Sequence, residues 1–349
     1  MSATDATAAR TEPVPDGEPL VVVDHLSRHF RLGGPRSRRV VRAVDDVSLV
    51  LNRGETVGLV GESGSGKSTL ARLLLRLDEP TSGSIRFEST DLFGISSREL
   101  RRLRREMQIV FQDPYASLNK RKTVEQSVSF PLVVHNRSLS RKNRSAKVTE
   151  LLELVGLRPE HASAYPRQLS GGQCQRVSIA RALALHPKLV VLDEAVSAVD
   201  VSIQAQILNL LRGLQDRLDL TYLFVTHDLA VVRYMADTIA VMYLGRIVEQ
   251  GPRDSLFAEP RHPYTHALLT SIPRAPGEVQ REQIVLREAP PSDTLPSGCR
   301  FHPRCPLGGR EVCRTVDPPL HPTAPGHTVA CHFPQSARSL LAEAARAPQ

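Results

Sequence analysis

One short stretch constrains the fold of this chain more than any other: the glycine-rich segment Gly61–Thr69, which reads GESGSGKST. It fits the pattern G-x-x-x-x-G-K-[ST]. The apolar run Thr56–Val60 precedes it, and apolar residues at helical spacing follow it from Lys67 to Leu77. A strand, a glycine-rich turn and a helix in this order form the first half of a βαβ unit, so the sequence predicts an α/β fold.

The residue types in this segment are those that bind phosphate. The glycines let backbone N–H groups point at phosphate oxygens, and the start of a helix adds partial positive charge. In such a loop Lys67 reaches the β- and γ-phosphates of ATP, and the Ser68 hydroxyl is a ligand of Mg²⁺. The alternative, a glycine-rich surface turn, is disfavoured by the strand before it and the helix after it. The predicted nucleotide-binding residues here are Gly61, Glu62, Ser63, Gly64, Ser65, Gly66, Lys67, Ser68 and Thr69.

A pair of carboxylates follows a second apolar run. Leu189–Leu192 is predicted to be a strand, and Asp193 and Glu194 come directly after it. With a phosphate loop in the same chain, Asp193 is predicted to hold Mg²⁺ through water, and Glu194 to take a proton from an attacking water as general base. The alternative is a solvated strand end.

Composition and segment boundaries predict how the chain is organised. The chain has 349 residues, and 45 Lys and Arg against 37 Asp and Glu give a formal charge of +8. No stretch approaches the roughly 18 uninterrupted apolar residues of a membrane span. Residues 1–19 lack the apolar region of a secretory signal and are predicted to be a disordered lead-in. These features predict a soluble, cytosolic, basic protein.

The remaining chain is predicted to contain an α/β core, residues 20–251, and an appended module broken by prolines, residues 252–335, with a tail at 336–349. Within the core, residues 113–184 show helical periodicity and no strand pattern, which predicts a helical insertion. The predicted strands besides those above are Leu20–Val23, Val44–Leu51 and Thr221–Val225, and a helix is predicted over Ile203–Leu218.

A second glycine-rich segment, Leu169–Gln173, opens the predicted helix Gln173–Leu185. It is therefore a second candidate anion-binding element in one chain. A single ATP needs only one such cradle, so the second is expected to serve an ATP bound to another subunit.

At this point the chain resembles the ATP-binding-cassette ATPases, whose signature motif this segment matches. The resemblance implies a RecA-like P-loop NTPase core with an antiparallel β subdomain and a helical insertion. It implies that Gln112 touches Mg²⁺ and the attacking water, that His227 contacts the γ-phosphate, and that Asp200 lies in the D-loop. Phe30 is the candidate for the aromatic ring that stacks on adenine, although a core phenylalanine is an equal alternative.

The resulting site predictions fall into three groups. The predicted catalytic residues are Glu194, His227 and Gln112. The predicted Mg²⁺ ligands are Ser68, Gln112 and Asp193. Nucleotide contacts beyond the phosphate loop are predicted at Phe30, Ser170, Gly171, Gly172, Gln173 and Asp200.

The resemblance is closer to one subfamily. The segments Gln108–Asn119, Val201–Leu211 and His262–Leu269 are similar to oligopeptide/dipeptide importer ATPases, in particular their F-type subunit. This implies an ATP-hydrolysing subunit that powers import of di- or oligopeptides and lies at the cytoplasmic face of the membrane. The implied partners are two transmembrane permeases, a second, D-type ATPase and, indirectly, an extracytoplasmic solute-binding protein. Nickel or another small solute is an alternative cargo, and a soluble cassette ATPase acting on nucleic acid is the competing class.

The chain departs from the subfamily pattern without losing a catalytic side chain. Lys120 and Ala195 each replace a proline, and Val199 replaces a leucine. Cys174 stands where arginine or glutamine is usual. Because Cys174 adjoins the signature segment, it is expected to affect the contact between subunits.

Four further cysteines lie in a stretch rich in proline and glycine: Cys299, Cys305, Cys313 and Cys331. Such a stretch cannot form a core from its apolar residues, so it needs disulfide bonds or a bound metal to stabilise it. A cytosolic location disfavours disulfides, and the spacing differs from the C-x₂₋₄-C of common zinc sites. It resembles the C-terminal module of peptide-importer ATPases, in some of which such cysteines hold a [4Fe–4S] cluster. Zinc, with His302 or His332 as alternates, and unligated thiols remain open.

Two basic stretches, Arg98–Arg105 and Arg137–Lys147, have several interpretations. They could be solvated helix faces, or they could bind nucleic acid or anionic lipid headgroups. They lack the interleaved aromatic residues of single-strand binders, so no nucleic-acid partner is predicted.

Overall fold

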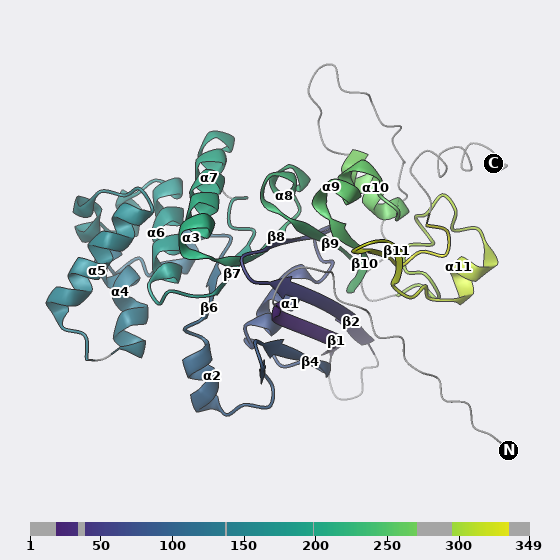
Figure 1. Ribbon diagram of the computed structural model, residues 1–349, viewed down its shortest axis with the longest axis horizontal. Helices are drawn as coiled ribbons and strands as arrows, with labels where there is room; N and C mark the ends of the chain where they lie inside the picture. The colour runs from purple at the N-terminus through teal and green to yellow at the C-terminus, as the bar shows by residue number, and fades with distance from the viewer. Residues whose placement is uncertain (1–18, 34–38, 137, 198, 271–294, 335–349) are drawn as a thin grey trace.

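A computed structural model of the protein describes residues 19–33, 39–136, 138–197, 199–270 and 295–334 (Figure 1). The predicted tail, residues 336–349, and all but the last residue of the predicted lead-in, residues 1–19, lie outside the described residues. In the described part of the chain, no helix has the length and apolar character needed to cross a membrane.

The core of the fold is a mixed sheet with a parallel centre. In pairing order its described strands are β11 (His321–Ala324), β12 (His327–Val329), β10 (Arg246–Pro252), β9 (Thr238–Tyr243), β3 (Thr56–Val60), β8 (Thr221–Thr226), β7 (Leu189–Asp193) and β6 (Met107–Val110). Strands β9, β3, β8, β7 and β6 pair in parallel. The strands predicted at Thr56–Val60, Leu189–Leu192 and Thr221–Val225 are confirmed as β3, β7 and β8, whereas β6 and β9 lie outside the predicted strands.

The apolar runs become central strands because both faces of this sheet are covered. Val190 of β7 packs in a buried cluster with α6 (Gly171–Leu183) and α7 (Val201–Leu218), and the next residue, Val191, packs on the opposite face with α1 (Lys67–Leu74). Continuous burial of both faces is what makes parallel strands read as unbroken apolar segments. The predicted helices Gln173–Leu185 and Ile203–Leu218 are confirmed as α6 and α7. Helix α1 ends at Leu74, before the predicted end at Leu77.

A second, antiparallel sheet packs beside α1 on that same side of the core (Figure 1). Its described strands, in pairing order, are β2 (Arg39–Asn52), β1 (Pro19–Leu32), β4 (Ser82–Phe87) and β5 (Thr90–Asp91). The short helix α2 (Ser97–Leu103) follows β5. This sheet confirms the antiparallel β subdomain, and β1 and β2 extend the strands predicted at Leu20–Val23 and Val44–Leu51.

The helical insertion is confirmed for the described residues between 113 and 184, which contain no strand. Its elements are α3 (Pro114–Ser117), α4 (Val124–His135), α5 (Arg141–Leu154), the 3₁₀ turns η1 (Pro159–Ser163) and η2 (Pro166–Gln168), and α6. Val148, Leu151 and Leu152 form the buried stripe of α5 that their spacing predicts. Figure 1 shows these helices gathered at one end of the molecule.

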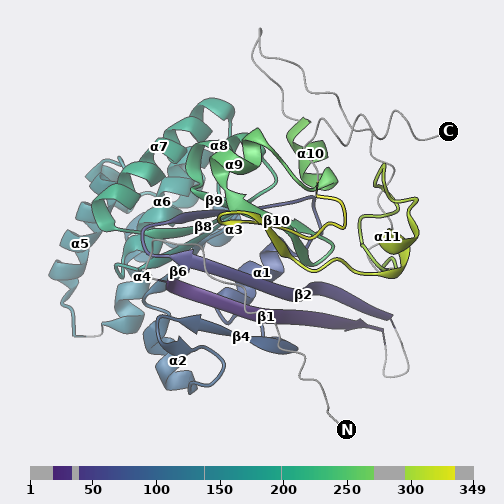
Figure 2. The ribbon, with the colours of Figure 1, turned by 45° about the vertical axis from the view of Figure 1, so that its right-hand side comes forward.

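The C-terminal region is joined to the core sheet. Here the C-terminal region means the described residues after 252. Its helices α9 (Arg253–Ala258) and α10 (Pro263–Thr270) precede residues 271–294, and α11 (Glu311–Thr315) follows them. Helix α8 (Leu229–Met235) lies between β8 and β9 of the core. Strand β12 pairs antiparallel with β10, and β11 pairs with β12, so this region lengthens the sheet of the core (Figure 2). The predicted boundary at residue 252 lies at the end of β10, and the division into domains stays a prediction.

Candidate functional site

The phosphate loop connects β3 to α1 and is closely surrounded by backbone. Gly66, the N-cap of α1, has φ of 108°, and a Cβ atom there would lie 1.9 Å from the Ala43 carbonyl oxygen of β2. A Cβ at Gly61 would lie 2.1 Å from the Met242 carbonyl oxygen of β9. Only glycine fits these two positions, because both neighbours are backbone atoms.

Lys67 lies in the concave side of this loop and is 4% exposed. Its Nζ donates hydrogen bonds to the carbonyl oxygens of Gly61 at 2.8 Å and Glu62 at 2.9 Å. Burial lowers the pKa of Lys67, although the carboxylates of Glu194 and Asp193 counteract the shift. A buried ammonium group among backbone N–H groups gives the loop the charge that a triphosphate requires.

Asp193, at the end of β7, faces the start of α1. The Ser68 hydroxyl donates a hydrogen bond of 3.0 Å to Asp193 Oδ1. Burial raises the pKa of Asp193, and the neighbouring charge of Glu194 adds to this rise. A hydroxyl and a carboxylate side by side are the hard oxygen ligands that suit Mg²⁺, so the residues fit the predicted metal.

Glu194 lies where the ends of the adjacent strands β6, β7 and β8 meet. Gln112, which follows β6, donates from Nε2 to Glu194 Oε2 at 2.8 Å, and Nδ1 of His227, which follows β8, lies 3.4 Å from Glu194 Oε1. Glu194 has a positive φ of 48°, and its N–H donates to the Val225 carbonyl at 2.8 Å. The carboxyl edge of parallel strands thus places the amide, carboxylate and imidazole in one cluster beside the phosphate loop.

A pocket of about 260 Å³ opens in front of the loop. It is lined by Val41, Arg42, Ala43, Ser63, Gly64, Gly66, Lys67, Ser68, Thr69, Glu194, Leu244 and Leu295. Phe30 is absent from this lining, and the Arg28 guanidinium lies 4.6 Å from its ring centroid. Because Phe30 pairs across the sheet with Val41, which does line the pocket, stacking of Phe30 on adenine stays a prediction.

The signature segment lies elsewhere, at the start of α6 in the helical region. Ser170 is the N-cap: its hydroxyl accepts a hydrogen bond from the Gln173 N–H, and the Gln173 side chain accepts from the Ser170 N–H. Neither residue lines the pocket, and Asp200, the N-cap of α7, is exposed and also outside it. The structure therefore does not bring these predicted nucleotide contacts to the phosphate loop of the same chain.

Cys174 faces away from the signature surface. It is fully buried in the helical region, its Sγ donates to the Pro166 carbonyl at 3.4 Å, and burial raises its pKa to about 11. The replacement therefore puts a small apolar side chain in the core of the helical region, and an effect on subunit contact would have to be indirect.

The four C-terminal cysteines lie near one another without forming a metal site. Within the described residues all four are free thiols, and no three His, Cys, Asp or Glu side chains converge closely enough to hold a metal ion. Burial raises the pKa of Cys299 to about 11 and those of Cys305 and Cys331 to about 12. The Cys299 N–H donates to the Cys313 carbonyl at 2.9 Å. The positions of these side chains therefore do not match the predicted cluster.

Sequence reasoning missed two residues that touch the phosphate loop from the C-terminal region. The Tyr264 hydroxyl accepts a hydrogen bond from the Glu62 N–H at 2.8 Å, and Arg304 forms an ion pair with the Glu62 carboxylate. Tyr264 lies in the stretch that marks the subfamily resemblance, but that stretch carries no signal for contact with a loop so distant in sequence.

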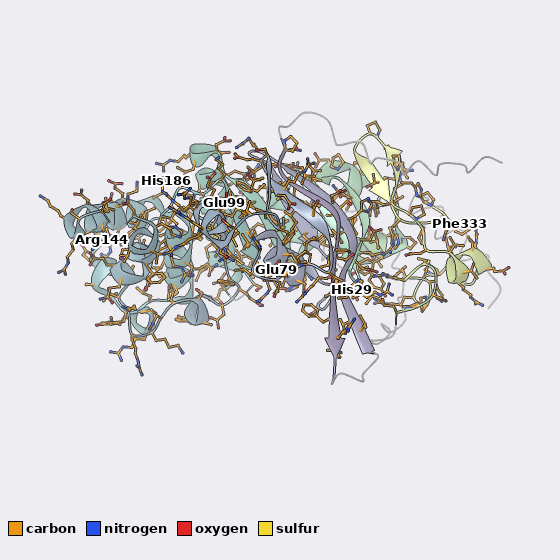
Figure 3. All side chains as sticks on the ribbon, turned by 90° about the horizontal axis from the view of Figure 1, so that it is seen from below. His29, Glu79, Glu99, Arg144, His186 and Phe333 are labelled. Atoms are coloured by element: carbon orange, nitrogen blue, oxygen red, sulfur yellow. The ribbon has the colours of Figure 1, made fainter. Side chains whose placement is uncertain are left out.

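The basic stretches lie on exposed parts of the surface. Arg98 and Arg101 are exposed on α2, and Figure 3 places Arg144 of α5 at the end of the molecule opposite Phe333. These positions leave the three interpretations of the stretches as predictions.

Two family models match the chain. Residues 44–197 match the model described as ABC transporter, and residues 248–313 match the model described as oligopeptide/dipeptide transporter, C-terminal region.

Curated relatives are similar over almost the whole chain. The probable peptide ABC transporter ATP-binding protein y4tS of Sinorhizobium fredii is 52% identical over 317 residues, which cover 90% of this chain and 89% of the relative. The oligopeptide transport ATP-binding protein AppF of Bacillus subtilis is 50% identical over 323 residues, with 90% and 98% covered.

Solved structures share the fold of the core. CbiO1 from Clostridium perfringens, part of the ABC transporter complex cbiONQ, has a TM-score of 0.61 at 30% identity and covers 69% of this chain and 92% of its own. The ATP-binding cassette MJ0796, in a dimeric post-hydrolysis state bound to ADP and Pi, has a TM-score of 0.60 at 31% identity, with 67% and 98% covered.

Proposed function

The chain belongs to the ATP-binding proteins of oligopeptide/dipeptide ABC transporters, and we propose that it hydrolyses ATP to power the import of di- or oligopeptides. One observation carries the proposal: the side chains of Ser68, Asp193, Glu194, Gln112 and His227 converge beside the phosphate loop. Two relatives with this overall similarity are described as peptide or oligopeptide transport proteins.

In the proposed reaction, the backbone of the loop and Lys67 bind the β- and γ-phosphates of ATP. Ser68, Asp193 and the amide of Gln112 are the residues that would hold Mg²⁺, which supplies charge neutralisation at the phosphates when bound. Glu194 takes the proton from the water that attacks the γ-phosphorus. The bond from the γ-phosphorus to the β–γ bridging oxygen breaks and ADP leaves, while His227 contacts the transferred γ-phosphoryl group. The distance of 3.4 Å between His227 Nδ1 and Glu194 Oε1 supports placing both side chains at the γ-phosphate.

The signature residues Ser170, Gly171, Gly172 and Gln173, together with Asp200, act in the proposal on an ATP bound to a second subunit. Their absence from the pocket of this chain and the exposure of Ser170 and Asp200 support that assignment. A similar cassette, MJ0796, is described as dimeric. ATP binding would close such a dimer and hydrolysis would reopen it, which is a rigid-body switch driven by the γ-phosphate.

The partners follow from the same proposal. We propose two transmembrane permeases, with this F-type subunit bound peripherally at their cytoplasmic face, because relatives are described as ATP-binding proteins of peptide transport. A second, D-type ATPase subunit completes the nucleotide sites, and an extracytoplasmic solute-binding protein delivers cargo. The residues named above act on ATP and not on the cargo, so nickel or another small solute remains the alternative. Import of labelled peptide against labelled Ni²⁺ into vesicles distinguishes them.

A [4Fe–4S] cluster at Cys299, Cys305, Cys313 and Cys331 is a separate hypothesis. It is supported by the proximity of the thiols, since Cys313 raises the pKa of Cys299, and Cys299 and Cys313 raise the pKa values of Cys305 and Cys331. No step above depends on it. Iron analysis and a visible spectrum of anaerobically purified protein test it, and an iron-free, colourless preparation removes it.

Glu194→Gln in the assembled transporter tests the proposed chemistry. Turnover should fall by about 10²- to 10⁴-fold, the usual contribution of a general base, while ATP binding is retained. Glu153→Gln, an exposed carboxylate on α5, is the matched control and should hydrolyse ATP at the wild-type rate. Hydrolysis near the wild-type rate in Glu194→Gln would refute the assignment.

A further inference from the structure

The phosphate loop is in contact with the C-terminal region through Glu62. Its backbone N–H donates to the Tyr264 hydroxyl at 2.8 Å. Its carboxylate accepts two hydrogen bonds from Arg304, from Nη1 at 2.9 Å and Nη2 at 3.0 Å. A bidentate arginine–carboxylate pair of this kind fixes orientation as well as charge. Both groups come from more than 200 residues away along the chain.

The two contacting side chains are held rigidly. Tyr264 of α10 is fully buried and packs against Tyr243 and Phe301, with ring centroids 4.7 and 5.5 Å away. The Arg304 guanidinium lies 5.8 Å from the Tyr243 ring and 6.0 Å from the Phe301 ring, and the side chain is 8% exposed. Aromatic faces and burial leave Arg304 few alternative positions.

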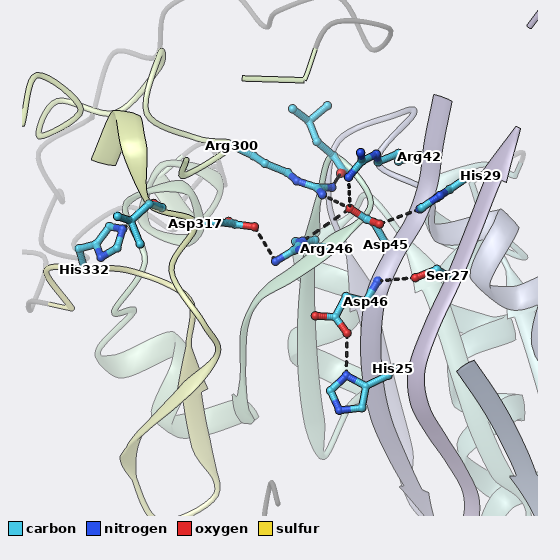
Figure 4. Close-up of polar contacts among 12 residues, drawn as sticks. His25, Ser27, His29, Arg42, Asp45, Asp46, Arg246, Arg300, Asp317 and His332 are labelled. Carbon is cyan, nitrogen blue, oxygen red and sulfur yellow. Dashed lines mark hydrogen bonds and ion pairs between the residues drawn. The ribbon is translucent and has the colours of Figure 1, made fainter. Parts of the chain in front are cut away.

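The backbone that carries Arg304 is itself fixed. The N–H groups of Arg304 and Cys305 both donate to the Phe301 carbonyl at 3.0 Å. Arg300 of the same turn donates to the Leu244 carbonyl and pairs with Asp45, which also contacts His29, Arg42 and Arg246 (Figure 4).

This second contact also leads to the phosphate loop. Gly245, directly after Leu244, donates from its N–H to the Ser65 carbonyl at 2.9 Å. The turn at residues 299–305 therefore reaches the loop at Glu62 directly and at Ser65 through the Leu244–Gly245 turn.

The charge of Glu62 gives the Arg304 contact a chemical consequence. The Glu62 carbonyl accepts a hydrogen bond from Lys67, and the Glu62 carboxylate is close enough to raise the pKa of that lysine. A carboxylate in this position opposes the binding of an anionic triphosphate. The Arg304 guanidinium neutralises it and directs it toward the C-terminal region.

We propose that Arg304 and Tyr264 are positioning residues of the ATP site: they fix the phosphate loop at Glu62 and neutralise its carboxylate, so that the loop is preorganised for the triphosphate. This inference rests on the proposed function, because it assumes that the loop binds ATP. It also gives the C-terminal region a role at the nucleotide site.

The test is the ATP dependence of hydrolysis by the assembled transporter carrying Arg304→Gln. We expect KM for ATP to rise about tenfold, equivalent to about 1.4 kcal/mol and within the range of hydrogen bonds to charged groups, while kcat at saturating ATP changes far less. Tyr264→Phe, which keeps the buried ring, should raise KM by about threefold, since one neutral hydrogen bond is lost.

Rescue separates a positioning role from structural damage. Adding Glu62→Gln to Arg304→Gln should lower KM part of the way back to the wild-type value, because the unpaired carboxylate is gone while the bidentate pair that fixes the loop is still missing. Arg314→Gln removes the same charge from an exposed position of α11 and should leave KM unchanged. An unchanged KM in Arg304→Gln, or a KM in the double variant as high as in the single variant, overturns the inference. A wild-type transporter that binds no ATP overturns the proposed function with it.

Discussion

The chain contains two glycine-rich segments that each open a helix, and their surroundings differ. At the phosphate loop, a Cβ on Gly66 would lie 1.9 Å from a backbone oxygen of β2, and no side chain caps α1. At the signature segment, a Cβ on Gly171 would meet no atom nearer than 3.9 Å, and Ser170 caps α6. Gly66 is thus enclosed by backbone, whereas Gly171 faces open space and its neighbour Gly172 is buried against the Ile203 side chain.

The two helix starts also differ in how their backbone N–H groups are satisfied. Backbone N–H groups at a helix start must be satisfied by side chains, water or ligands. At α1 the groups needed for a triphosphate, from Lys67 to Asp193, are already assembled around the loop. At α6 the N–H groups of Ser170 and Gln173 are used in the capping box, and Lys67, Asp193 and Glu194 have no counterpart among the signature residues 169–173.

The largest expected effect is that of Gly66→Ala. The new methyl group collides with the Ala43 carbonyl at a φ of 108°, so the loop must shift, and ATP binding should weaken by at least about 100-fold. Titration with a fluorescent ATP analogue measures this. Gly213→Ala on α7 is the control, because this helical position has open space, lies outside the pocket and should leave ATP affinity unchanged. Equal affinities in the two variants would contradict the enclosure of the loop.

Gly171→Ala, in the signature segment, should reduce hydrolysis without changing ATP binding by the isolated subunit. The nearest atoms lie 3.9 and 4.0 Å from the added methyl group, so the fold and ATP binding by the isolated subunit should be unchanged. Hydrolysis by the assembled transporter should fall by about 10- to 100-fold, as expected when a reacting group is misplaced by about 1 Å.

The control for this variant is Gly213→Ala on α7, which also has open space and should not reduce hydrolysis. Full activity of Gly171→Ala would mean that the signature surface approaches no nucleotide.

Ser170→Ala should lower the free energy of unfolding by about 1 kcal/mol, because the N-cap hydroxyl that accepts from Gln173 is lost. Chemical denaturation of the isolated subunit measures this change. A cost of this size would sharpen the contrast with α1, whose start has no side-chain cap to lose. No change in stability would show that the capping box contributes nothing to α6.

The smallest expected effect is that of Asp193→Asn on stability without nucleotide. Burial raises the pKa of Asp193 above 3.8, so the ionised carboxylate is less favourable in the folded than in the unfolded chain. The variant should therefore unfold at a slightly higher temperature near neutral pH, with the difference disappearing as pH falls toward 3.8 and the wild-type group becomes protonated. Thermal unfolding against pH measures this, and a variant that is less stable at neutral pH would contradict it.

Local patterns in the sequence predicted the fold class and most of the site. The strand–loop–helix order around Gly61–Thr69 and the carboxylates after Leu189–Leu192 are continuous in sequence, and each is fixed by short-range preferences. The strands β4, β5, β6, β9, β10, β11 and β12 lay outside the predictions. β4 reads SGSIRF, whose glycine and serines resemble a turn, and β6 has only the four residues MQIV.

The sequence by itself determined that a phosphate loop, a carboxylate pair and a second glycine-rich helix start follow one another, because each depends on neighbouring residues. Only the tertiary structure decided which of them meet. The pairing order β3–β8–β7–β6 brings Gln112 and His227 to Glu194, and the fold places Arg304 on Glu62 and buries Cys174. These contacts join residues far apart in the chain, whose association depends on packing of the whole sheet and has no local signal.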